Sequence, residues 1–320
     1  MRNFLFVLAT AFLAVGASVP ADAADSLPVW AYPVNPPGLN PAPDDGSLKH
    51  VPNSAAAYTL TQIRDLFSPP DWHPSNHPPM PDVVGRGNKP GQFPCGFCHL
   101  PNGLGRPENS SLAGLPAAYI AQQVADFRSG ARKSAEPASL PINLMIAVAQ
   151  LVSEEDAKIA AEYFASLKPA PWIRVVETET VPKTRVGGWM LIADGSGGTE
   201  PIGQRIIEMP ENLERTELRD SASGFIAYAP VGSIRKGEAL ITSGAGRTTP
   251  CAICHGAELK GLGPVPALAG RSPSYIVRQL YDMRHGMRNG QWAALMKPVV
   301  AGLSEEDMVA IAAYTASLAP

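Results

Sequence analysis

The chain has 320 residues, a formal net charge of -3 and four cysteines. This length predicts about two domains, each large enough to bury a hydrophobic core. The weakly acidic balance, without a basic patch, excludes nucleic acid as a partner.

The first 23 residues have the form of a secretory signal peptide. A short positive start precedes the apolar run 4–17, and Ala21-Asp22-Ala23 offers an A-x-A cleavage site. The run is too short to span a bilayer, and no later stretch reaches the roughly 18 apolar residues of a spanning helix. We therefore predict a mature protein in the periplasm, with residues 1–23 removed and without a transmembrane segment.

Residues 24–79 form a proline-rich extension. The chain has 33 prolines, about twice the usual share, and many of them lie between residues 19 and 94. Such a segment favours irregular chain that lies on a surface, not a separate core. Its His73 and His77 are candidate metal ligands, and the simpler interpretation is that they stabilise the extension itself.

One five-residue signature occurs twice in the chain, as Cys95-Gly-Phe-Cys98-His99 and as Cys251-Ala-Ile-Cys254-His255. C-x-x-C-H attaches c-type haem. The two thiols add to the vinyl groups of the porphyrin, and the adjacent histidine becomes the proximal ligand of the iron.

Short disulfides, a four-cysteine zinc site and a thioredoxin-like motif are the alternatives. A zinc site would have to join two half-sites more than 150 residues apart, and it would leave the paired histidines unexplained. A redox C-x-x-C belongs in a βαβ setting, which neither pair has. We therefore predict two covalently bound haem c groups, which use all four cysteines.

The two halves of the chain repeat beyond these motifs. A shift of 156 residues places Leu112-Ala113-Gly114 on Leu268-Ala269-Gly270, and a shift of 151 places Ser153 on Ser304. Many further positions match in the same order, which indicates a duplicated domain.

Each repeat is predicted to be helical. In the first repeat, a helix opens at Tyr119 and ends at Gly130, because a glycine readily adopts the conformation that closes a helix. Ser153 starts another helix, since its hydroxyl can accept the free backbone N–H groups of the first turn. The last helix of the second repeat runs from Ser304 to Leu318.

The predicted fold class is mainly α, with two tandem helical domains. They cover residues 80–169 and 232–320, and a connector of residues 170–231 joins them. Residues 172–181 alternate in polarity and are rich in β-branched side chains, so we expect short strands in the connector.

A haem iron held by one histidine has a sixth position, and its occupant decides between electron transfer and catalysis. Met145 lies 46 residues after His99 and Met296 lies 41 after His255, each of them eight residues before the serine of the last helix. We predict that both thioethers bind iron, the alternative being core methionines. The competing ligands come from the proline-rich region: His73, His77 and Met80.

With these motifs, the halves resemble class I cytochrome c domains, and the whole resembles the periplasmic dihaem cytochromes c. The resemblance implies that a proline carbonyl before the Leu-Ala-Gly element orients the proximal histidine; Pro266 matches, whereas Ser110 stands there in the first half. It also implies hydrogen bonds to haem propionates from matched side chains, and for the arginines among them a solvated helix face is the alternative. These side chains are Tyr119, Arg128, Arg132, Tyr275, Arg284 and Arg288.

The function that we predict is electron transfer without catalysis. The carrier would take single electrons from a dehydrogenase and pass them to an oxidase or another cytochrome. A narrower version of this prediction makes it the cytochrome subunit of the dehydrogenase. The alternative is an enzyme, either a dihaem peroxidase or a sulfur-compound dehydrogenase. A peroxidase needs an open iron site, and a cysteine-ligated sulfur enzyme needs a fifth cysteine, so the sequence disfavours both.

Overall fold

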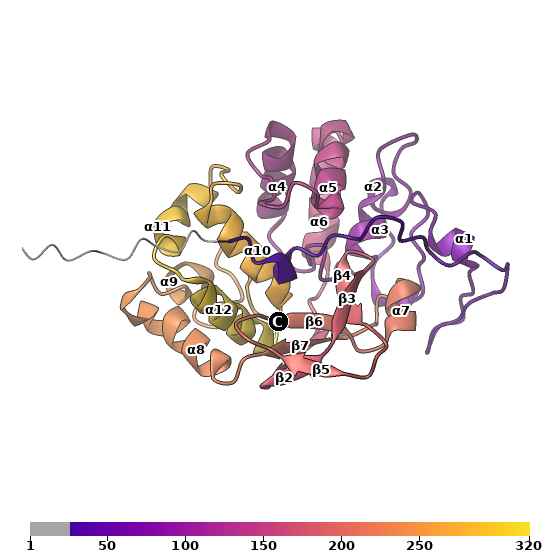
Figure 1. Ribbon diagram of the computed structural model, residues 1–320. Helices are drawn as coiled ribbons and strands as arrows, with labels where there is room; N and C mark the ends of the chain where they lie inside the picture. Colours follow the sequence, from indigo (N-terminus) through magenta and orange to yellow (C-terminus); the bar gives the residue numbers. More distant parts are fainter. Residues whose placement is uncertain (1–25) are drawn as a thin grey trace, which may run out of the picture.

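The computed structural model describes residues 26–320 (Figure 1). The predicted signal peptide, residues 1–23, lies outside the described residues. The helices of the first half are α1 (Leu60–Ile63), α2 (Asp82–Gly85), α3 (Cys95–His99), α4 (Ala117–Ser129), α5 (Leu140–Leu151) and α6 (Glu154–Ser166). Those of the second half are α8 (Ser233–Ser243), α9 (Ala252–His255), α10 (Pro273–Arg284), α11 (Lys297–Val300) and α12 (Glu305–Ser317). Helices thus hold more of the described residues than strands do, as the mainly α class predicts.

The helix ends follow from the local sequence. The hydroxyl of Ser153 accepts a hydrogen bond from the backbone N–H of Asp156 at 2.9 Å, and Ser304 accepts one from Asp307 at 3.2 Å. The acidic first turns of α6 and α12 also suit the positive end of the helix dipole. Helix α4 ends at Gly130, whose φ of 74° is left-handed. These predicted ends are confirmed, and α4 begins two residues earlier than expected.

The hydrophobic core of the second half lies between α8, α10 and α12. Helix α8 crosses α12 at Gly237, where a Cβ atom would lie 2.1 Å from the carbonyl oxygen of Ala310. A glycine is therefore required for the two backbones to approach. In the first half, α2, α4 and α6 surround a separate core, but α2 has only four residues where α8 has eleven.

The segment between the halves contains short strands. They are β1 (Ile173–Glu177), β2 (Thr180–Pro182), β3 (Thr184–Gly187), β4 (Met190–Ala193), β5 (Thr199–Pro201), β6 (Ile207–Pro210) and β7 (Phe225–Ala229), with α7 (Leu213–Glu217) before the last. Strand β7 pairs in parallel with β1 and antiparallel with β6, while β2–β5 and β3–β4 are antiparallel pairs.

This strand-rich segment packs against both halves. Strands β1 and β7 contact α12, and Ala227 and Ala229 belong to the core of the second half. Trp172 and Phe225 instead belong to the core of the first half, with their rings edge to face. The segment therefore lies along one side of both halves, below α4, α5 and α6 in Figure 1.

Residues 26–79, which we call the N-terminal strap, run across the molecule from α10 towards α1 (indigo in Figure 1). At its start, the hydroxyl of Tyr32 donates to Asp282 of α10 at 2.8 Å, and Ala31 is fully buried. At its far end, the indole N–H of Trp72 donates to the carbonyl of Leu218 at 2.8 Å. The strap is thus anchored on the second half and on the connector.

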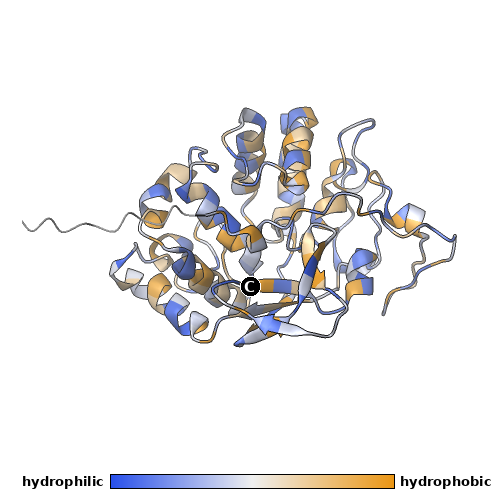
Figure 2. Ribbon diagram, in the orientation of Figure 1, coloured by the Kyte–Doolittle hydropathy of each residue, from blue (hydrophilic) through white to orange (hydrophobic). Residues whose placement is uncertain are grey.

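Among the described residues, no helix is long and apolar enough to cross a membrane. Figure 2 shows hydrophobic and hydrophilic residues on the same helices, for example around α5 and α6. Such helices bury one face and hydrate the other.

The contact at Gly237 generates a first prediction. Replacing Gly237 by alanine should lower the free energy of unfolding by about 1–3 kcal/mol, the usual cost of overpacking a close contact. Chemical denaturation followed by circular dichroism measures the change. The neighbouring exposed Glu238→Ala in the same helix is the matched control, and equal stabilities for the two variants would contradict the close crossing.

Candidate functional site

The first C-x-x-C-H motif forms the single helical turn α3. Residues three apart lie on the same side of a helix, so Cys95 and Cys98 face the same way. The turn ends at Leu100, whose φ of 63° turns the chain out of the helix directly after His99. The local sequence therefore presents two thiols and an imidazole together.

These three side chains line a cavity of about 1290 Å³, a volume that includes the part open to solvent. Met145 of α5 lines the same cavity. The predicted ligand pair, His99 and Met145, is thus brought to one space from elements 46 residues apart in sequence. Most of the remaining wall is apolar and includes Ile120, Val124, Phe127, Leu144, Val148 and Phe164.

Both motif histidines are oriented by a backbone carbonyl. The Nδ1 atom of His99 lies 2.7 Å from the carbonyl oxygen of Ser110, and Nδ1 of His255 lies 2.8 Å from that of Pro266. A carbonyl can only accept, so Nδ1 carries the proton and Nε2 keeps a free lone pair. The predicted contact with Pro266 is confirmed, and Ser110 makes the same contact in the first half.

The same environment keeps the imidazoles neutral. Burial lowers the pKa of His99 and of His255, because it disfavours the charged form, and this outweighs the raising effect of the carbonyl bonds. A neutral imidazole with a free Nε2 is the form that binds a metal.

The second motif forms α9, with Cys251 directly before it. Met296 lies between a short 3-10 helix, Ala293–Leu295, and α11. Both Cys251 and Met296 pack against the core of the second half, while Cys254 is exposed. The second site is therefore more open than the first at its thiols.

The residues of both sites fit a haem group. All four cysteines are free thiols, and the first site adds an apolar cavity between an imidazole and a thioether. A bound haem would supply one-electron chemistry through its iron, and the protein tunes it through ligands, burial and hydrogen bonds.

A polar network fills the contact between the two halves. The guanidinium of Arg132 donates to Gln123, Gln279 and Tyr275, each at 2.9 Å. The guanidinium of Arg288, in the other half, donates to Gln279, Gln123 and Tyr119. The backbone pairs there too, since the N–H of Lys133 donates to the carbonyl of Met287 at 2.7 Å and that of Asn289 donates to Ala131.

The burial of these two arginines bears on their predicted role. Arg132 and Arg288 are buried among neutral acceptors, and within residues 26–320 the Nε of Arg288 has no hydrogen-bond partner. The alternative of a solvated helix face is therefore wrong for both. Buried cations without carboxylate partners are costly, and nearby anions such as haem propionates would stabilise them. Arg132 and Tyr275 also line the first cavity.

The other two matched arginines bind backbone carbonyls. Arg128 donates to the carbonyls of Ala149 and Val152 at the end of α5, and Arg284 donates to that of Leu303. They tie each repeat's α4 or α10 to the turn before its last helix. These contacts give both arginines a structural role.

The competing iron ligands have other partners. Nε2 of His73 lies 2.9 Å from the buried carboxylate of Asp220, and Nε2 of His77 lies 3.1 Å from that of Asp71. Met80 packs against the core of the first half and is not among the residues that line the cavity. The histidines stabilise the strap, as the simpler interpretation predicted.

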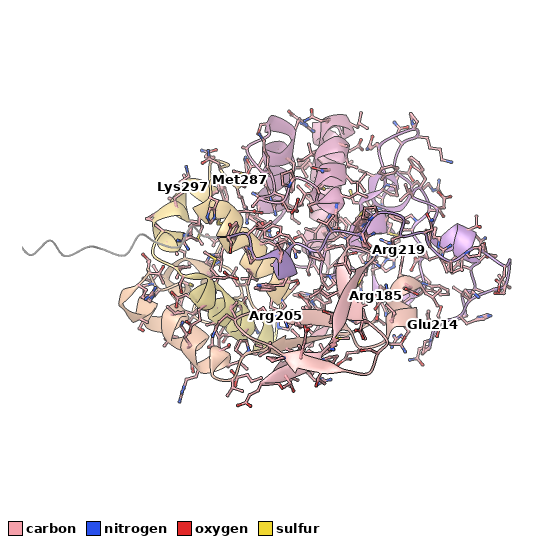
Figure 3. All side chains as sticks on the ribbon, in the orientation of Figure 1. Arg185, Arg205, Glu214, Arg219, Met287 and Lys297 are labelled. Atoms are coloured by element: carbon pink, nitrogen blue, oxygen red, sulfur yellow. The ribbon has the colours of Figure 1, made fainter. Side chains whose placement is uncertain are left out.

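Sequence reasoning missed Arg219, which lies beside α7 and reaches α3 (Figure 3). Its guanidinium donates to the carbonyl of Phe97 and lies 3.9 Å from the centre of the Phe97 ring. Burial lowers the pKa of Arg219 to about 9, and Arg106 acts in the same direction, so the side chain keeps its charge at neutral pH. No motif signals this contact, because 122 residues separate the two positions.

Several known proteins are similar to this chain, among them the three that follow, whereas no protein-family model matches it. Cytochrome c-554(548) of Halomonas halodenitrificans is 46% identical over 68 residues, which are 21% of this chain and 82% of that protein. Cytochrome c4 of Azotobacter vinelandii is 27% identical over 229 residues, 70% of this chain and 84% of that protein. The thiosulfate dehydrogenase electron acceptor of Thiomonas intermedia is 27% identical over 226 residues, 70% of this chain and 77% of that protein.

The Halomonas likeness is high over most of that protein's length, and the two longer matches cover most of this chain. Together with the repeated C-x-x-C-H motif, they lead to one conclusion. The chain belongs to the c-type cytochromes, as a dihaem electron carrier with haem c cofactors.

Proposed function

We propose that this cytochrome holds its haems covalently, the first through Cys95 and Cys98 and the second through Cys251 and Cys254. The axial ligands of the irons are His99 with Met145 and His255 with Met296. Each haem belongs to one of two tandem domains, residues 80–169 and 232–320, which the connector of residues 170–231 joins.

The observation that carries this proposal is the first cavity, which His99 and Met145 line together. With both axial positions filled, an iron has no site for peroxide or another small substrate, so electrons pass only between haems and partner proteins. The free Nε2 of His99, set by its bond to Ser110, supports the same arrangement. A carrier, and not a peroxidase, follows from this ligand set.

We propose a dehydrogenase of the periplasm as the electron donor, and a terminal oxidase or another cytochrome as the acceptor. Two relatives, from Thiomonas intermedia and from Stutzerimonas stutzeri, are named thiosulfate dehydrogenase electron acceptors. A dehydrogenase that oxidises thiosulfate is therefore the donor to test first. Secretion by the signal peptide of residues 1–23 would bring the chain to the compartment where c-type haem is attached.

Covalent attachment can be tested with one cysteine. Both haems of the unaltered protein should stay with the polypeptide during acid-acetone extraction, because thioether bonds hold them. Cys254→Ala should leave one fully retained haem and a second that is poorly attached. Mass spectrometry of the intact protein counts the haems, and release of both haems from the unaltered protein would contradict covalent binding.

Axial ligation can be tested with one methionine. Met296→Ala should open only the second iron, so that each molecule binds one carbon monoxide where the unaltered protein binds none. The reduction potential of that haem should fall, since a thioether favours the ferrous iron. Met80→Leu is the matched control and should bind no carbon monoxide. An unchanged spectrum in Met296→Ala would assign the sixth position to another residue.

The carrier role can be tested by reconstitution. Thiosulfate and a thiosulfate dehydrogenase together should reduce both haems, and a cytochrome oxidase should reoxidise them. The rate should depend on ionic strength, because charge steers transient docking. Reduction by thiosulfate without the dehydrogenase would instead make the chain an enzyme. Reduction by dithionite serves as the control for intact haems.

A further inference from the structure

The connector covers the first haem-binding motif. Besides the bond from Arg219 to Phe97, the side-chain amide of Asn102 donates to the carbonyl of Ser221 at 2.7 Å. The guanidinium of Arg106 donates to the carbonyl of Thr216 at 3.2 Å. Three contacts thus join the turn around α7 to the motif and to the loop that follows it.

The second motif has no such cover. Phe97 is 7% exposed, whereas Ile253, its equivalent after the shift of 156 residues, is 65% exposed. The position equivalent to Arg106 is Leu262, which is 61% exposed. The two haem sites therefore have closely related attachment motifs in different electrostatic surroundings.

The cover adds a cation, Arg219, to an ion pair that lies at the first site. Arg106 and Glu108 form an ion pair, with Nε and Oε1 2.7 Å apart, and both side chains are largely buried. Arg219 adds a second guanidinium that no carboxylate pairs with in the described structure, and its Nε is buried without a hydrogen-bond partner. The three side chains together carry one net positive charge.

This charge lies close to the first haem position. Glu108 and Cys98 line the same cavity, and Arg219 contacts Phe97, the residue directly before Cys98. Because the cluster is shielded from water, its charge acts through a low local dielectric and is weakly screened by salt.

We propose that Arg219 raises the reduction potential of the first haem and so separates the two haems in potential. Reduction of a haem iron removes one positive charge, so a buried cation nearby favours the reduced state. Glu108 acts in the opposite direction, as an anion on the wall of the same cavity. The proposal rests on the proposed covalent haem at Cys95 and Cys98.

The test is an optical redox titration of the complete dihaem protein and of single variants. Arg219→Gln should lower the potential of the first haem and leave that of the second unchanged. Glu108→Gln should raise the potential of the first haem, and Arg219→Lys, which keeps the charge, should stay near the unaltered value. Met296→Ala should shift the titration step that belongs to the second haem. The step that does not shift then belongs to the first haem.

Arg185→Gln is the matched control, since Arg185 is an exposed arginine of the connector, in β3 (Figure 3). It should leave both potentials unchanged. The methionine-to-iron absorption band must persist in every variant, which separates an electrostatic effect from loss of a ligand.

Two results would overturn the proposal. One is an unchanged reduction potential of the first haem in Arg219→Gln, with both haems bound. The other is a lower reduction potential of the first haem in Glu108→Gln. If Arg219→Gln does not fold, the sign of the shift in Glu108→Gln decides alone. Failure of the proposed function is distinct, because the unaltered protein would then lack a covalent haem at the first motif.

Discussion

The hydrogen bond from each motif histidine to a carbonyl eleven residues later is the interaction on which each site depends. It fixes which ring nitrogen is free, and it closes the loop that leads from the motif to the following helix. Without it, His99 could rotate away from the cavity that it shares with Met145. The carbonyl comes from the backbone, so a serine in the first half serves as well as the proline of the second.

Around this shared bond, the halves diverge according to what packs on them. The second half keeps the long α8, which crosses α12 at Gly237. The first half has only a short helix there, and its motif is covered by the connector and reached by Arg219. Between the halves the contact is symmetric, because Arg132 and Arg288 each donate to a tyrosine of the opposite half. The two motifs thus share the same histidine contact, whereas the elements packed around them differ.

What could be predicted from the sequence was local. A signature of five residues, a serine before acidic residues and a glycine after a helix each act within one or two turns, so their consequences follow from the chain alone. The carbonyl bond to His255 also lies within one loop. Contacts such as that of Arg219 with Phe97, or of His73 with Asp220, join positions more than 100 residues apart. They depend on how the halves pack, and the spacing of motifs in the sequence carries no information on that packing. The same holds for the burial of Arg132.

The N-terminal strap has a consequence for the order of folding. Tyr32 and Asp282, which it joins, are separated by 250 residues, and Trp30 and Glu305 by 275. Contacts at such separation form late, because the entropy cost of closing a very long loop must be met before the contacts can form. The strap cannot dock until α10 and α12 have been synthesised and folded. Docking of the strap on these helices is therefore a late step of folding, and it completes the native protein.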